Sequence, residues 1–205
     1  WLNKNYVYTG GEGVHDVRRK DYKPVAPKRV KSAEIDPSVK KIGTRAFYNC
    51  RELKSIIIPE GVEVVCEAAF RYCEKLMNVQ FPSTIKQLKG RAFEGCVGLD
   101  SIAIPEGVEE VDEGVFFNCY NLVEVELPAT LKTIGNRAFS ECGSLEILKV
   151  PEGTKMIGYS AFSHCYKLKE FELPSTVKRI GKEALKQCDS LTRVTLPLIS
   201  DIFKH

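Results

Sequence analysis

Several features that mark membrane or nucleic-acid-binding proteins are missing from this chain of 205 residues. No stretch approaches the roughly 20 consecutive apolar residues that span a bilayer, and no apolar stretch after Trp1 has the form of a signal peptide. The net charge is only +3, and 30 basic residues are mixed with 27 acidic ones along most of the chain. Without a basic stripe we expect no nucleic-acid partner, and we expect no transmembrane segment in this chain.

Histidine is scarce, which limits catalytic and metal chemistry. The three histidines are His15, His164 and His205, and no Cys-x-x-Cys pair is present that a histidine could complete to four zinc ligands. His164 stands beside Cys165, but that cysteine belongs to a regular series that we expect to point into the core. We find no clustered catalytic set. We therefore expect a protein without enzymatic activity, cofactor or metal.

Cysteine and proline, in contrast, each recur with a fixed step of 23 residues. The regular cysteines are Cys50, Cys73, Cys96, Cys119, Cys142, Cys165 and Cys188, and the prolines are Pro59, Pro82, Pro105, Pro128, Pro151, Pro174 and Pro197. An unbroken period of this length predicts a solenoid, in which copies of one short unit stack on each other, rather than a globule with a pocket.

Each copy combines two hydrophobic spacings. The motif Ala-Phe-x-x-Cys-x-x-Leu (residues 138–145 in one copy) has steps of one, three and three, which are typical of a helical turn or short helix. Leu148 and Val150 then lie two apart, which indicates a short half-buried strand that ends at Pro151. We predict an α/β solenoid of about seven stacked layers, with a parallel strand sheet on one face and short helical turns on the other.

A second, weaker pattern alternates between successive layers. Glu-Gly follows every second proline (residues 60–61, 106–107 and 152–153), while Ser-Thr or Ala-Thr follows the others (83–84, 129–130 and 175–176). Arginine likewise occupies one column in every second layer. Two interpretations remain open: alternation keeps like charges apart on neighbouring layers, or the chain arose by duplication of a two-layer unit.

The cysteine column allows three interpretations. A ladder of buried thiols that act as small hydrophobic side chains is favoured. Disulfides between layers are disfavoured, because parallel inward side chains are poorly aimed for the required dihedral and because seven is an odd number. A thiolate metal site lacks further ligands. Cys66 lies outside this series, in a column that holds glycine in four other layers, and its reactivity is open.

This motif resembles the leucine-rich repeats, specifically the BspA-like subclass with 23-residue repeats. The resemblance covers Val30 to Pro197 and implies a curved solenoid, often on the surface of bacteria or protists, that binds host or matrix proteins. It therefore implies an extracellular or cell-surface location. The residues that carry the resemblance in one copy are Leu122, Val125, Leu127, Pro128, Leu131, Ile134, Ala138, Phe139 and Cys142.

A candidate partner-binding patch lies on the strands, among the side chains that alternate with the buried ones. Three successive layers place four carboxylates around an isoleucine and a lysine, and two tyrosines precede these strands. Aromatic residues beside charges favour protein recognition. We expect a monomeric protein-binding module for adhesion or for host or matrix proteins, which takes a basic segment of another protein here. The candidate residues are Glu124, Glu126, Ile147, Lys149, Glu170, Glu172, Tyr120 and Tyr166.

Two other functions remain open. The solenoid could be a structural spacer that presents another domain, with a strand face that is merely solvated. It could also bind carbohydrate through Tyr120, Tyr166 and the neighbouring carboxylates.

The two ends of the chain do not follow the repeat. Residues 1–29 are rich in lysine and arginine, and we expect an N-terminal cap or basic arm, with a hairpin between residues 6–8 and Val14. The solenoid itself is expected over 30–197. Residues 198–205 contain apolar side chains that suit a C-terminal cap, because the open core of a terminal repeat must be covered.

Overall fold

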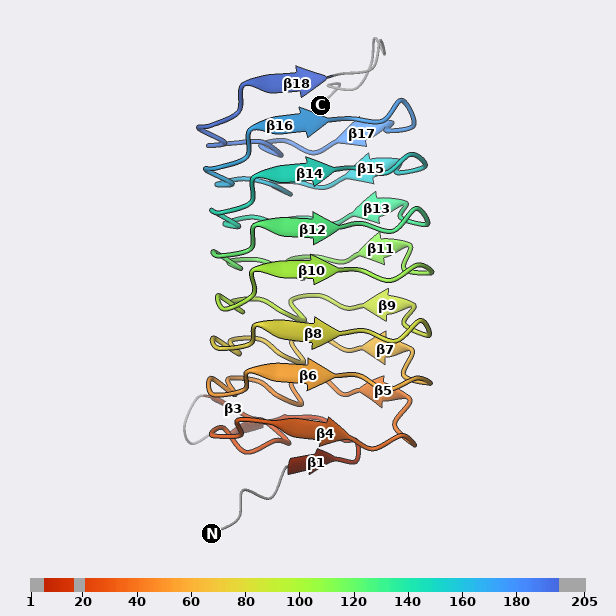
Figure 1. Cartoon of the computed structure of the whole chain (residues 1–205), viewed down its shortest axis with the longest axis vertical. Helices are drawn as coiled ribbons and strands as arrows, with labels where there is room; N and C mark the ends of the chain where they lie inside the picture. The colour runs from red at the N-terminus through yellow and green to blue at the C-terminus, as the bar shows by residue number, and fades with distance from the viewer. Residues whose placement is uncertain (1–5, 17–20, 196–205) are drawn as a thin grey trace.

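The structure, a computed structural model that describes residues 6–16 and 21–195, is a stack of short parallel strands in two columns (Figure 1). The front column in Figure 1 contains β4 (Ala33–Ile35), β6 (Ser55–Ile57), β8 (Asn78–Gln80), β10 (Ser101–Ala103), β12 (Glu124–Glu126), β14 (Ile147–Lys149), β16 (Glu170–Glu172) and β18 (Arg193–Thr195). The back column contains β5 (Lys41–Ile42), β7 (Val64–Val65), β9 (Gln87–Leu88), β11 (Glu110–Val111), β13 (Thr133–Ile134), β15 (Met156–Ile157) and β17 (Arg179–Ile180). The eight front strands make a solenoid of about eight turns, where the sequence predicted about seven layers.

The predicted helical face is wrong: the described residues contain no helix. The Ala-Phe-x-x-Cys segments form successive tight turns, with amide bonds to the carbonyl three residues back, as from Cys73 to Phe70 (3.1 Å). Residues four apart, such as Ala68 (φ 53°) and Tyr72 (φ 62°), adopt left-handed backbone conformations that a right-handed helix excludes. Alternate amides then bond to the next layer, as from Phe70 to Ala92 (2.8 Å). No described helix could cross a membrane.

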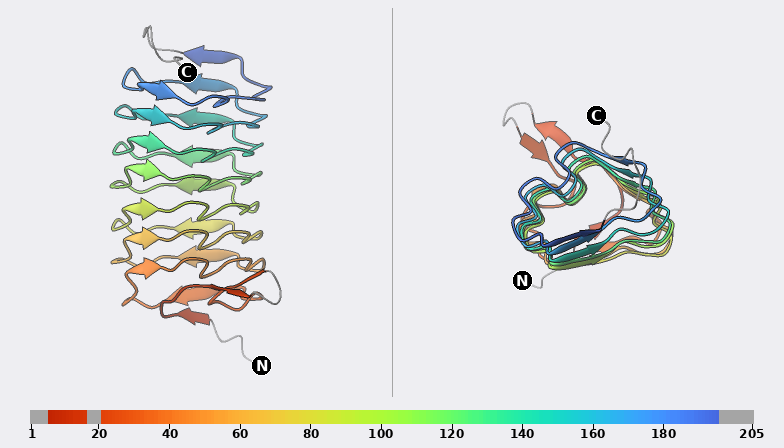
Figure 2. Two further views of the ribbon diagram at one scale, coloured as in Figure 1. Left: turned by 180° about the vertical axis from the view of Figure 1, so that it is seen from behind. Right: turned by 90° about the horizontal axis from the view of Figure 1, so that it is seen from above.

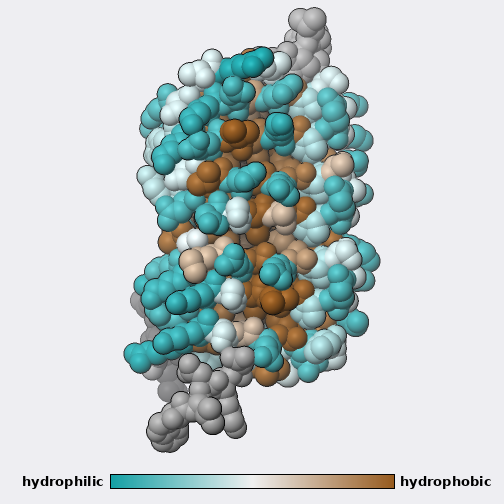
Figure 3. Space-filling view, viewed as in Figure 1, coloured by the Kyte–Doolittle hydropathy of each residue, from teal (hydrophilic) through white to brown (hydrophobic). Residues whose placement is uncertain are grey.

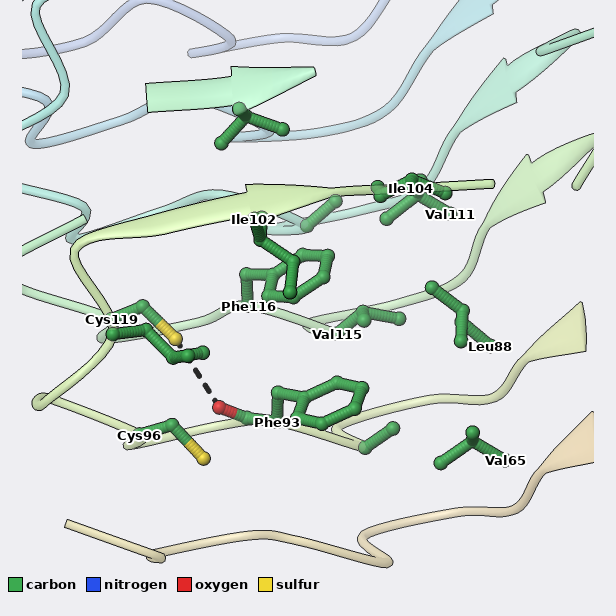
Figure 4. Close-up of a cluster of buried hydrophobic side chains, with 14 of the residues drawn as sticks. Val65, Leu88, Phe93, Cys96, Ile102, Ile104, Val111, Val115, Phe116 and Cys119 are labelled. Carbon is green, nitrogen blue, oxygen red and sulfur yellow. Dashed lines mark hydrogen bonds between the residues drawn. The ribbon is translucent and has the colours of Figure 1, made fainter. Parts of the chain in front are cut away.

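A column of stacked phenylalanines fills the core between the two strand columns (Figure 4). Neighbouring rings lie 5.0–5.7 Å apart and within 11° of parallel, and every ring in the stack is buried. Tyr8 packs against one end of the stack and Phe171 against the other, each with ring centroids 5.3 Å from its neighbour. One coil could not bury such a ring alone, so the stack ties each layer to the next. The stacked rings are Phe47, Phe70, Phe93, Phe116, Phe139 and Phe162.

The cysteine series forms the buried thiol ladder favoured by the sequence. All eight cysteines are free, and the six from Cys50 to Cys165 are fully buried. From Cys73 to Cys188, each thiol donates to the carbonyl of a phenylalanine one layer back, as from Cys119 Sγ to Phe93 O (3.2 Å; Figure 4), whereas Cys50 Sγ donates to Pro27 O (3.6 Å). Burial raises the pKa of Cys50 to about 12 and raises the pKa of Cys73 well above its ordinary value. The ladder thiols are therefore neutral hydrogen-bond donors.

Burial predicts a clear order of thiol reactivity. Cys66 and Cys188 are both half-buried, and burial raises the pKa of both thiols, that of Cys188 to about 11. With a thiol reagent at pH 8, we expect one fast phase from Cys66 and a slower one from the half-buried Cys188, with the six ladder thiols reacting only on unfolding. Mass spectrometry of the labelled peptides measures this order. A Cys66→Ser variant should lose the fast phase, whereas rapid labelling of Cys119 in the native protein would contradict the ladder.

The alternation between layers corresponds to two kinds of side-chain clip. After every second proline, a glycine amide donates to a threonine hydroxyl of the next layer, as from Gly61 to Thr84 Oγ1 (3.0 Å), and that hydroxyl donates to Val62 O (2.8 Å). The equivalent threonines are Thr130 and Thr176. Arg45 and Arg91 clip the intervening interfaces by ion pairs to Glu67 and Glu113, both 3.4 Å.

From β6 to β16, strand pairing follows the same alternation, whereas the last pair, β16–β18, has three paired residues although it follows a threonine-clipped pair. The threonine-clipped pairs β6–β8, β10–β12 and β14–β16 each contain three paired residues. Between them, β8 is not paired with β10, and β12 shares a single residue pair with β14. The threonine clips alone join layers in twos, which favours the duplication of a two-layer unit over electrostatic tuning alone.

The N-terminal residues pack on the first coil. The predicted hairpin between residues 6–8 and Val14 is wrong: β1 (Tyr6–Tyr8) pairs in parallel with β4, and β2 (Val14–Asp16) pairs antiparallel with β3 (Asp21–Lys23), as Figure 2 shows beside the coils. Tyr8 is fully buried, and its hydroxyl donates to Gly11 O (2.7 Å) and accepts from Gly43 N (2.8 Å). The hydrogen bond from Gly43 joins residues 35 apart in the chain, so a prediction from local turn patterns could not include it. The predicted cap at 198–205 lies outside the described residues.

Candidate functional site

The charged candidate residues lie side by side on three neighbouring front strands. Glu124 aligns with Ile147 and Ile147 with Glu170, while Lys149 aligns with Glu172. The middle residue of each strand is buried, so the residues on either side of it point outward and are exposed. We call these six outward residues of β12, β14 and β16 the acidic patch: Glu124, Glu126, Ile147, Lys149, Glu170 and Glu172.

The carboxylates of the acidic patch differ from most others on the solenoid in having no partner. Within residues 6–16 and 21–195, no side-chain hydrogen bond or ion pair engages Glu124, Glu126, Glu170 or Glu172. By contrast, Glu52 pairs with Lys75 (2.9 Å), and Glu146 pairs with Lys169 (2.7 Å), whose hydrogen bond lowers the pKa of Glu146. The patch therefore presents negative charge that the scaffold does not use.

The apolar part of the patch is Ile147, whose side chain is 58% exposed between Glu124 and Glu170. Figure 3 shows the same face, with hydrophobic side chains along its middle and hydrophilic ones on both sides. A large exposed apolar side chain flanked by charges is a composition that protein interfaces use.

The two candidate tyrosines lie at the corners that precede β12 and β16. Tyr120 is 50% exposed, and its ring lies directly over Gly143, where a Cβ would come within 2.6 Å of Cε2. Tyr166 is 36% exposed, and its hydroxyl is 3.0 Å from Nδ1 of His164. In the described part of the chain, neither tyrosine hydroxyl is hydrogen-bonded to a carboxylate of the acidic patch. The tyrosines therefore stand beside the acidic patch rather than within it.

A groove that the sequence did not predict runs along β10, next to the acidic patch. It has a volume of about 250 Å³ and is lined by β8, β10 and the two glutamates of β12. Ser101 and Ala103 are short and exposed, whereas the outward side chains of both neighbouring strands are long. The sequence does show that the outward side chains of this layer are short and uncharged. That they line a groove, however, follows only from the relative positions of the neighbouring strands.

The arrangement offers little to catalysis. Cys165 is buried and donates to Phe139 O (3.3 Å), while the adjacent His164 contacts Tyr166, so the two do not form a nucleophile and base. In the described residues, no group of three or more histidine, cysteine or acidic side chains could hold a metal ion.

Comparison with known proteins agrees with this repeat. The chain is similar to a leucine-rich repeat protein from T. pallidum, with 25% identity, a TM-score of 0.55 and coverage of 81% of this chain and 70% of that one. It is also similar to a leucine-rich repeat protein from Bacteroides ovatus, with 24% identity, a TM-score of 0.49 and coverage of 83% and 68%. No curated protein is similar enough to count as a match. The model of the BspA-type leucine-rich repeat region matches residues 27–123 and 86–204, and the chain belongs to that family.

Proposed function

We propose that the chain is a non-enzymatic protein-binding module whose acidic patch takes a basic segment of another protein. The observation that carries this proposal is the set of four unpartnered carboxylates on strands held in register. A fixed sheet presents them without a cost for ordering a loop, and complementary charge steers a basic partner to the face.

The patch also contains the elements of a specific interface. Ile147 supplies apolar area at its centre, and burying its exposed side chain against a partner would contribute to affinity. Lys149 stands beside Glu172 on the neighbouring strand, so a partner with a uniform basic surface meets one repulsive charge. The patch thus favours a basic segment with an interrupted charge pattern.

The location proposed for the module is extracellular or on the cell surface. This proposal rests on the family resemblance alone. The free thiol ladder is compatible with it, because six of the thiols are buried away from oxidants.

Charge reversal on the front column tests the proposed function. We expect Glu124→Lys/Glu126→Lys to weaken binding at least about tenfold, because two unpartnered carboxylates become repulsive to a basic segment. The matched control is Glu109→Lys/Glu110→Lys, which changes the charge equally at exposed positions of the back column. Surface plasmon resonance of the immobilised chain against purified matrix and serum proteins measures the affinities.

Each outcome of that experiment is decisive. Weaker binding by Glu124→Lys/Glu126→Lys, with unchanged binding by Glu109→Lys/Glu110→Lys, supports the acidic patch. Equal affinities in both variants would remove the patch as the binding site. If the wild-type chain binds no protein of the panel, the structural spacer is favoured, and binding on a glycan array that is lost on Tyr120→Ala would favour carbohydrate.

A further inference from the structure

One interface between layers is interrupted in both strand columns. In the front column β8 is not paired with β10, although both are paired on their other edges, to β6 and β12. In the back column β9 and β11 share only the pair Leu88–Val111, where the neighbouring pairs share two. We call this interface the seam. No other interface between successive turns in the described chain combines an unpaired front with a weakened back.

Backbone hydrogen bonds that occur at neighbouring interfaces are absent at the seam. Lys86 N donates to Glu63 O (2.9 Å), and Lys132 N donates to Glu109 O (2.8 Å). The equivalent bond from Glu109 N to Lys86 O is not formed in the described structure. On the turn side the layers remain joined, by Arg91 N to Glu113 O (2.9 Å) and by the stacked rings. The seam is thus open at the strands and closed at the turns.

The front opening of the seam is the groove along β10. Its floor is formed by Ser101 and Ala103, and its walls by the outward side chains of β8 and β12. In the described part of the chain, no partner engages the amides of Asn78 and Gln80 or the carboxylates of Glu124 and Glu126. Both walls therefore offer free hydrogen-bonding groups toward the same space.

The strand edges add a second and independent source of free polar groups. The edge of β10 that faces β8 has no strand partner, so its backbone N–H and C=O groups are left for solvent or a ligand. Val79, in the middle of β8, is only half-buried, whereas the middle residues of β10 and β12 are buried. The interior of the sheet is thus accessible at this place.

We propose that the groove binds an extended peptide with basic side chains at alternate positions; this inference rests on the proposed function. In an extended chain, residues i and i+2 point to the same side and lie about 6.6–6.8 Å apart, which is also the spacing of Glu124 and Glu126 on β12. Two basic side chains of the peptide can therefore pair with the two carboxylates at once. The amides of Asn78 and Gln80 and the free edge of β10 bind the polar groups on the other side.

The occupant follows from the chemistry of the walls. Two carboxylates repel phosphate groups, which disfavours nucleic acid, and no aromatic ring lines the groove for stacking on a sugar. Charge complementarity and the free backbone groups together favour a basic peptide in an extended conformation.

A bulky substitution on the groove floor tests this inference without changing charge. We expect Ser101→Trp to weaken binding of a labelled octapeptide of alternating arginine and threonine at least about tenfold, because the indole fills the groove. The matched control is Ser55→Trp, at the same exposed strand position two layers away, which should change affinity less than about twofold. Fluorescence anisotropy measures affinity, and thermal unfolding verifies that both variants fold.

Further variants and probes separate this inference from the proposed function. If Ser101→Trp binds the octapeptide as tightly as Ser55→Trp does, while Glu124→Lys/Glu126→Lys loses binding, the groove is ruled out as the binding site and the acidic patch is retained. Equal binding by the charge-reversed variant as well overturns both. Failure of the wild-type chain to bind the arginine peptide, or equal binding of an octapeptide of alternating glutamate and threonine, overturns the groove whatever the matrix-protein panel shows.

Discussion

Raising the pH from 8 to 10 is expected to remove on the order of 10 kcal/mol from the free energy of unfolding. The cause is the buried thiol ladder. Burial raises the pKa of Cys50 to about 12 and those of the five ladder thiols from Cys73 to Cys165 well above the ordinary range, so these thiols stay protonated in the folded state. In the unfolded chain they ionise near pH 8.5.

The direction of the effect follows from proton linkage. A group whose folded pKa is raised contributes stability that is fully present below the unfolded pKa and is lost as the pH rises toward the folded pKa. Each fully buried thiol therefore costs about 2 kcal/mol at pH 10 relative to pH 8, and six of them are fully buried. Because domains are typically stable by about 5–15 kcal/mol, we expect unfolding near pH 9–10.

Urea unfolding followed by circular dichroism, with a non-thiol reductant present, measures this dependence. Cys119→Ala removes one ladder thiol and should reduce the loss between pH 8 and 10 by about 2 kcal/mol. Cys66→Ala provides the control, because that thiol is only half-buried and should contribute less. A free energy of unfolding that stays constant to pH 10, or an equal change in both variants, would contradict the account of the ladder.

Replacing Phe116 with alanine is expected to lower the free energy of unfolding by about 3–5 kcal/mol. The ring is fully buried between Phe93 and Phe139, with centroid distances of 5.6 and 5.3 Å. Truncation leaves a cavity at two layer interfaces at once, and in a solenoid each layer is stabilised chiefly by its neighbours.

The adjacent residue gives a control of the same type. Phe117 is only half-buried and lies outside the ring stack, so Phe117→Ala should cost clearly less than Phe116→Ala. Urea denaturation of both variants, monitored by circular dichroism, compares them. Equal losses would show that the phenylalanine stack is not the main source of stability between layers.

Strand positions could be predicted from the sequence, whereas the turns could not. Two hydrophobic residues spaced two apart before each proline fit a single short strand with one inward face. In β14, for example, Leu148 is buried as expected between the exposed residues Ile147 and Lys149. Steps of three, in contrast, fit both a helix and a series of tight turns. Tight turns form instead of a helix because residues such as Tyr72 adopt left-handed backbone conformations and because backbone amides bond to the next layer. Neither feature can be read from the local spacing of hydrophobic residues.

For the candidate site, the exposed residues of the acidic patch could be predicted from the sequence, whereas the groove beside them could not. Exposure of Glu124 and Glu170 follows from strand alternation, and the structure places them on either side of Ile147. The groove beside Ser101 was not predictable, because it depends on a break in strand pairing that is set by backbone positions across several layers. Residue types alone indicated only that this layer is small and uncharged.

We expect the partner to bind on the front strands and not elsewhere on the solenoid. Chemical-shift mapping by NMR of the isotopically labelled chain, titrated with the arginine–threonine octapeptide, tests it most directly. We expect the shifted amides to cluster at residues 78–80, 101–103 and 124–126. Shifts concentrated on the back column at 110–111, or spread evenly along the solenoid, would contradict it.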